Sequence, residues 1–149
     1  MKNLILIILI TVSGLCLKAQ TNLDSMWGIW NDTSADPLVR LNTMDLLIFE
    51  GYLFNKPDSA YILACSMLEL AIAVDSKKHI GSSTTLKGGS FYFRSEYDSA
   101  LHYFGKAIPI YQEAGILGPV ASVYGNMANI YTDQGNYQKG IDCYMRSLK

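Results

Sequence analysis

The chain has 149 residues, half of them hydrophobic, and its 12 basic and 13 acidic side chains leave a formal net charge of −1. This length suits one domain with a real core. The near balance of charge argues against nucleic acid as a partner, because phosphates require a basic face.

The segment 1–19 has the pattern of a signal peptide. Lys2 precedes the apolar run Leu4–Leu17, which ends at Lys18, with the small residue Ala19 just before the expected cleavage site. This run is shorter than the roughly 20 apolar residues that span a bilayer. We therefore expect an exported protein of the periplasm or cell envelope whose mature chain begins near Gln20. An uncleaved amphipathic anchor is the alternative.

Residues 20–37 are polar and show little periodicity apart from Trp27 and Trp30. We interpret them as a mobile leader or a partial cap of the array. The two tryptophans could instead dock on the first helix pair, and the sequence leaves both alternatives open.

The rest of the chain repeats with a period of 40. The triplet Asp-Ser-Ala at 58–60 recurs at 98–100, and Gln-Lys-Gly occupies the same position at 138–140. A short turn precedes each triplet, and apolar residues follow at intervals of three and four, which is typical of an amphipathic helix. Ala100, Phe104 and Ala107 illustrate this spacing. Each unit is thus predicted to be helix, turn, helix.

On these residues the chain resembles the tetratricopeptide repeat, in which small residues let paired helices approach and aromatic residues fill the space between pairs. The third copy matches best, and the first is degraded, keeping mainly Ala60. The resemblance implies an all-α fold, a right-handed α-α superhelical solenoid of about three helix pairs over residues 38–149. The expected repeats are 38–77, 78–117 and a truncated 118–149. The period of 40 rather than 34 marks a long-repeat variant.

The sequence contains little catalytic chemistry. His79 and His102 are interpreted as exposed or partly buried surface residues, and neither has a partner at metal-ligand spacing. Cys65 and Cys143 lie nearly two repeats apart and are expected to be two buried thiols. We predict no enzyme, no cofactor, no metal and no small-molecule substrate.

The resemblance places candidate partner-binding residues on the first helix of each pair, which lines the concave groove in similar proteins. In the third copy these residues are Asn126, Asn129 and Asp133, and Tyr92 is the aromatic candidate one repeat earlier. An amide can donate to and accept from a peptide backbone. The alternative is that the asparagines only solvate the helix or bridge neighbouring helices.

Two functional classes follow. The first is a scaffold that binds a protein or peptide partner in its groove. The second is the sensory part of a longer membrane signalling protein, with a histidine kinase, nucleotide cyclase or transcriptional regulator as output. The third repeat is shorter than the second, since Lys149 corresponds to Pro109. We therefore expect an uncovered apolar face on the last helix, which could self-associate.

Overall fold

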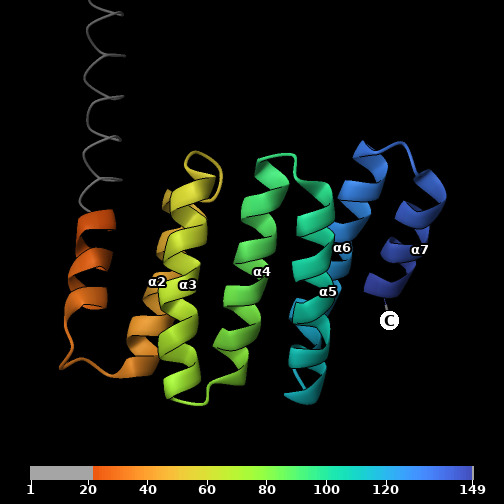
Figure 1. The fold of residues 1–149 in the computed structure, drawn as a ribbon. Coiled ribbons are helices and arrows are strands. Elements are labelled where there is room, and N and C mark those ends of the chain that lie inside the picture. Colours follow the sequence, from red (N-terminus) through yellow and green to blue (C-terminus); the bar gives the residue numbers. More distant parts are fainter. Residues whose placement is uncertain (1–21, 149) are drawn as a thin grey trace, which may run out of the picture.

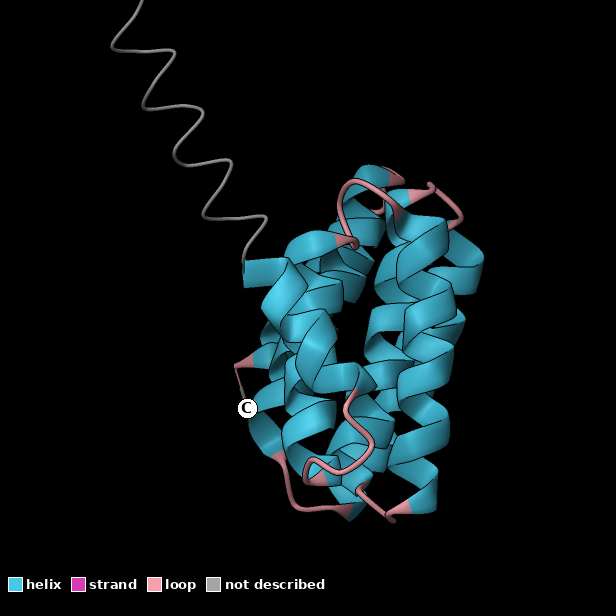
Figure 2. Cartoon of the chain, turned by 90° about the vertical axis from the view of Figure 1, so that its left-hand side faces the viewer, coloured by secondary structure: helices cyan, strands magenta, loops and turns pink. Residues whose placement is uncertain are grey.

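A computed structural model describes residues 22–148, so the predicted signal peptide lies outside the described residues. Throughout this range the regular structure is helical, and Figures 1 and 2 show helices stacked side by side with short connections. Residues 22–31 form a leading helix. The later helices are α2 (Pro37–Gly51), α3 (Pro57–Ala73), α4 (Lys77–Phe93), α5 (Tyr97–Glu113), α6 (Leu117–Asp133) and α7 (Tyr137–Ser147). In the described range, no helix combines the length and apolar character needed to cross a bilayer.

From α2 onward the helices begin at a constant interval, and two such intervals give the period of 40 found in the sequence. The helices α3 to α6 each have 17 residues, which leaves three residues for each connection. The helices α4 and α6 begin at Lys77 and Leu117, one residue before the expected repeat boundaries.

The four connections after α3 share one backbone conformation. Asp75, Ser95, Gly115 and Gly135 all have positive φ, between 51° and 73°. After α3, the amide of Ser76 donates to the Ala71 carbonyl (2.9 Å) and that of Asp75 to the Ile72 carbonyl (3.1 Å). Equivalent pairs close α4, α5 and α6. This Schellman arrangement satisfies helix carbonyls that would otherwise lack partners, and it reverses the chain within three residues.

Small residues allow α4 to pack closely against α5. A Cβ atom on Gly88 would come within 2.7 Å of the Phe104 ring on α5, and one on Gly81 within 2.6 Å of Tyr111. Ala100 and Ala107 on α5 are fully buried. The close approach predicted from the repeat pattern therefore occurs where a side chain is short or absent.

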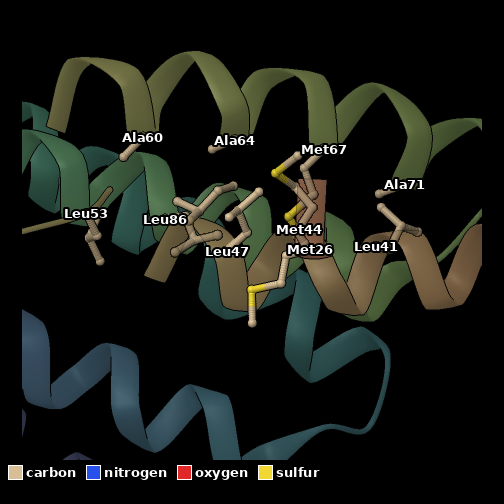
Figure 3. Packing of buried hydrophobic residues seen from close by; sticks show 11 residues of the cluster. Met26, Leu41, Met44, Leu47, Leu53, Ala60, Ala64, Met67, Ala71 and Leu86 are labelled. Atoms are coloured by element: carbon tan, nitrogen blue, oxygen red, sulfur yellow. The ribbon is translucent and has the colours of Figure 1, made fainter. Parts of the chain in front are cut away.

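The leading helix differs from the predicted mobile leader. Met26 is buried with Met44 and Leu47 in the first core cluster, as Figure 3 shows. The Trp27 indole donates to the Tyr52 hydroxyl (3.0 Å). Over residues 22–31 the structure therefore shows the alternative, a segment docked on the first helix pair, and not a mobile leader. Residues 23, 26, 27 and 30 have helical spacing, which the tryptophans alone did not reveal.

The core consists of two clusters of buried side chains. The first joins the leading helix, α2 and α3 to Leu86 of α4, and the second joins α5 to α6 around Phe104 and Val123. Figure 3 shows the alanines of α3 facing the larger side chains of α2. Each cluster thus lies between successive helices. The faces of α2, α4 and α6 that point away from the clusters remain available to form a groove.

Candidate functional site

A groove runs along α4, with α2 and α6 as its sides. Two adjoining cavities of about 330 and 500 Å³ make it up, and they share four lining residues: Phe49, Thr85, Leu86 and Asn126. From Ser82 at one end to Phe93 at the other, the rise of a helix gives a length of about 16 Å. A groove of this length accommodates about five residues of extended chain.

One end of the groove is polar. Asn42, Asp45, Ser82 and Ser122 line it, and the Ser82 hydroxyl donates to Asp45 Oδ1 at 2.6 Å. This hydrogen bond links α2 to α4 and uses only part of the acceptor capacity of the carboxylate. The polar end can therefore offer hydrogen-bond acceptors to a ligand.

The opposite end is aromatic. The rings of Phe49 and Phe54 meet edge to face with centroids 5.6 Å apart, and Phe54 meets Phe93 at 4.8 Å. All three remain substantially exposed, at 51%, 53% and 39%. Adjacent exposed rings of this kind are unusual on a free surface and typical of binding sites.

The structure brings the four predicted residues together. Tyr92, Asn126 and Asn129 line the same cavity at the aromatic end, and the Tyr92 hydroxyl donates to Asp133 Oδ2 (2.9 Å). Asn129 Oδ1 accepts a hydrogen bond from Tyr144 (2.6 Å). Asn129 therefore bridges neighbouring helices, as the alternative interpretation held for the asparagines, and Asp133 also joins two helices. Asn126 is exposed at the centre of the groove.

Burial raises the pKa of Tyr92, and its hydrogen bond to Asp133 raises it further. The phenol therefore keeps its proton near neutral pH and remains a donor. This bond holds the Tyr92 ring at the edge of the aromatic end, beside Phe93 (centroids 5.2 Å apart).

Residues of α2 also line the groove, and they were not among the predicted residues. Phe49 and Leu46 lie two repeats before Asn129 and Asn126, at the same positions of the repeat, and Leu86 and Gly89 lie one repeat before them. Subtracting the period from the predicted residues would have found them. The degraded first repeat hid this signal, because its match to the family pattern rests on Ala60.

His79 is almost fully buried, which corrects the prediction of an exposed or partly buried surface residue. Its Nδ1 lies 2.7 Å from the Ser76 hydroxyl, and its Nε2 lies 3.0 Å from Asn42 Oδ1 at the polar end of the groove. Burial lowers the pKa of His79, with a further contribution from Lys78 that Asp45 opposes.

Among residues 22–148 no cluster of three or more histidine, cysteine or acidic residues could hold a metal.

The two cysteines of the described range are free. Cys143 is buried, as predicted, and burial raises the pKa of its thiol. Cys65 is only half-buried, which corrects the prediction of two buried thiols.

Comparisons with known proteins agree with this architecture. No protein-family model matches the chain. Response regulator aspartate phosphatase J of Bacillus subtilis is 29% identical over 85 residues, which is 57% of this chain and 22% of that protein, so the chain spans about a fifth of this relative. The crystal structure of the TPR domain of Arabidopsis FLU superposes with a TM-score of 0.61 at 19% identity, covering 87% of this chain and 93% of that domain. The predicted all-α helical-repeat solenoid is confirmed.

Proposed function

We propose that this chain is a protein-interaction scaffold whose groove binds a segment of a protein or peptide partner. The observation that supports it most is the continuity of the two cavities along α2, α4 and α6, lined by repeat-equivalent residues. The similarity of the fold to a TPR domain supports the general class.

The groove chemistry suits an extended or helical segment with a bulky apolar side chain. Phe49, Phe54 and Phe93 provide an apolar surface for that side chain. Asn126, at the centre of the groove, can pair with both the amide and the carbonyl of a partner backbone. The exposed rings and the Asn126 amide therefore favour the binding of a partner segment as the role of the groove.

The test is peptide selection followed by measured affinity. Peptides selected by display against the chain lacking the segment 1–19 are titrated by calorimetry against the parent, Phe49→Ser and Asn126→Ala. We expect Phe49→Ser to weaken binding about tenfold or more, because exposed aromatic anchors carry much of an interface's free energy. Ile72→Ser is the matched control, since Ile72 is similarly exposed (59%) but lies on α3. Equal affinity for all variants contradicts the proposal.

A signalling role in the cell envelope is the second candidate. Its support is the sequence similarity to a protein named as a response regulator aspartate phosphatase, together with the signal-like pattern of residues 1–19. N-terminal sequencing of the protein recovered from a bacterial envelope fraction tests the export. A mature chain beginning near Gln20 supports it, and a cytoplasmic product that retains Met1 contradicts it.

Self-association through α7 is the remaining part of the proposal. Ile141 and Leu148 are 53% and 86% exposed, whereas their counterparts one repeat earlier, Leu101 and Ile108, are partly buried against the second core cluster. An apolar helix face of this kind favours contact with another surface.

A further inference from the structure

A second recess lies on the other side of α6 from the groove, between α6 and α7. Its volume is about 240 Å³, and we call it the α6–α7 slot; its lining residues are Tyr124, Met127, Tyr131, Lys139, Asp142, Cys143 and Arg146. At 100° per residue, Tyr124, Met127 and Tyr131 face opposite to Asn126, Asn129 and Asp133. The slot is therefore separate from the site proposed for a protein partner.

The equivalent position one repeat earlier is filled by the protein's own rings. There Tyr103 of α5 stacks on Phe91 of α4, with centroids 5.3 Å apart and planes 11° apart. Tyr61 completes this cluster edge-on to Phe91, at 5.4 Å. One repeat later Tyr131 replaces Phe91, and Cys143 replaces Tyr103. A cysteine is too short to cover the Tyr131 ring, so the space that Tyr103 fills in the second repeat is open in the third.

The slot also carries two cations close to its aromatic rings. Lys139 Nζ lies 5.4 Å from the centroid of the Tyr131 ring, and Arg146 Cζ lies 5.8 Å from that of Tyr124. Both project from one face of α7, because they are separated by two helical turns. Asp142 also lines the slot, and its Oδ1 accepts a hydrogen bond from Gln138 on the preceding turn (3.3 Å). Two cations against one carboxylate leave the slot positive.

We propose that the α6–α7 slot binds an aromatic ring that carries a carboxylate, either as a free aromatic acid or as an aromatic residue at a peptide C-terminus. The ring takes the place that Tyr103 occupies in the second repeat, against Tyr131 and beside Cys143. The carboxylate pairs with Arg146, whose planar guanidinium can bind it through two hydrogen bonds, and with Lys139. A cationic aromatic ligand would meet like charges there.

The experiment uses the chain lacking the segment 1–19, with ¹³C-labelled methionine methyl groups, because Met127 lines the slot. The probes are 3-phenylpropionate, its neutral analogue 3-phenylpropanol and its cationic analogue 3-phenylpropylamine. We expect the acid to shift the Met127 methyl signal with a Kd about fivefold lower than that of the alcohol, the amine being weakest. N-acetylphenylalanine and a peptide ending in phenylalanine then distinguish a free acid from a peptide terminus.

Two variants test whether the acid binds in the slot. Cys143→Tyr restores the ring of the second repeat, so we expect a folded protein that no longer binds the acid. Arg146→Gln combined with Lys139→Gln should remove the preference for acid over alcohol, and this variant decides the matter if Cys143→Tyr does not fold. Lys106→Gln is the matched control, because Lys106 is the counterpart of Arg146 on α5. No Met127 shift at millimolar acid, or an unchanged preference in the double variant, overturns the proposal. Either result leaves the groove proposal unaffected.

Discussion

At the scale of single residues, the connections between helices depend on a left-handed backbone conformation at one position. Gly115 and Gly135 adopt it at no steric cost, whereas Asp75 and Ser95 adopt it with a side chain present, at φ of 51° and 62°. In residues that have a Cβ atom this conformation is unfavourable, because Cβ comes close to the carbonyl oxygen. Two of the four turns therefore carry backbone strain that glycine would remove.

Replacing Asp75 or Ser95 by glycine should stabilise the protein by about 0.5 to 1 kcal/mol, because the relief of strain exceeds the added freedom of the unfolded chain. The control is Gly115→Ala. A Cβ there meets nothing within 4 Å, so any loss comes from the backbone alone, and we expect about 1 kcal/mol. Urea denaturation measures all three, and a loss of stability in both glycine variants contradicts the prediction.

Gly88 is a second residue whose role is specific. Gly88→Ala should lower the free energy of unfolding by about 1 to 3 kcal/mol, because the new methyl group overlaps the buried Phe104 ring. Gly105→Ala makes the same chemical change in α5, where a Cβ meets nothing within 4 Å. That variant should gain about 0.5 to 1 kcal/mol from helix propensity. Thermal unfolding compares the two, and equal effects would refute the steric explanation.

At the scale of elements, a polar network joins α2 to α4. Asn42 Oδ1 lies 3.0 Å from His79 Nε2 and accepts from Lys78 Nζ at 2.9 Å, and Ser82 donates to Asp45. These bonds fix the spacing of the two helices at the polar end of the groove. Through the bond from His79 Nε2 to Asn42, a buried imidazole is thus part of the contact between the two helices.

Stability should therefore fall as pH decreases through about 6.5. Burial places the pKa of His79 in the folded chain below its ordinary value of 6.5. At pH values between the lowered pKa and 6.5, the unfolded chain therefore binds more protons than the folded chain does. Lys78, Ser76 and Asn42 face the ring, and the nearby Asp45 moderates the shift. Urea midpoints from pH 7.5 to 5 measure the effect. His79→Gln should flatten this part of the profile, and His102→Gln should leave it as in the parent; an unchanged profile in His79→Gln contradicts the assignment.

At the scale of the whole array, each helix pair is stabilised by its neighbours, as in other repeat proteins. In the second repeat α6 covers α5, and Phe104 is 1% exposed; Tyr144, its counterpart on α7, is 44% exposed. Within residues 22–148, α7 packs against α6. Within these residues, α7 should accordingly be less stable than α5.

The chain lacking the segment 1–19 should either self-associate through α7 or exchange amide protons there faster than in α5. Light scattering together with hydrogen exchange measures both. Ile141→Lys with Leu148→Lys should abolish the association, whereas Ile62→Lys, at a comparably exposed apolar position on α3 (64%), should not. A monomer in which residues 137–148 are as protected as residues 98–110 contradicts this prediction.

Sequence alone was enough to establish the helical repeat, its period and the buried face of helices such as α5. These follow from local rules, because the spacing of Ala100, Phe104 and Ala107 specifies a helix face and the triplets at 58–60, 98–100 and 138–140 fix the register. It also placed Asn126, Asn129, Asp133 and Tyr92 on one side of the array. Three features needed the folded chain. The leading helix is defined by its contact with Met44 and Tyr52, His79 is buried by α2, and the aromatic end of the groove joins Phe49 and Phe54 to Phe93. Each depends on which distant segment comes to lie opposite, and a pattern read along one stretch of chain does not contain that information.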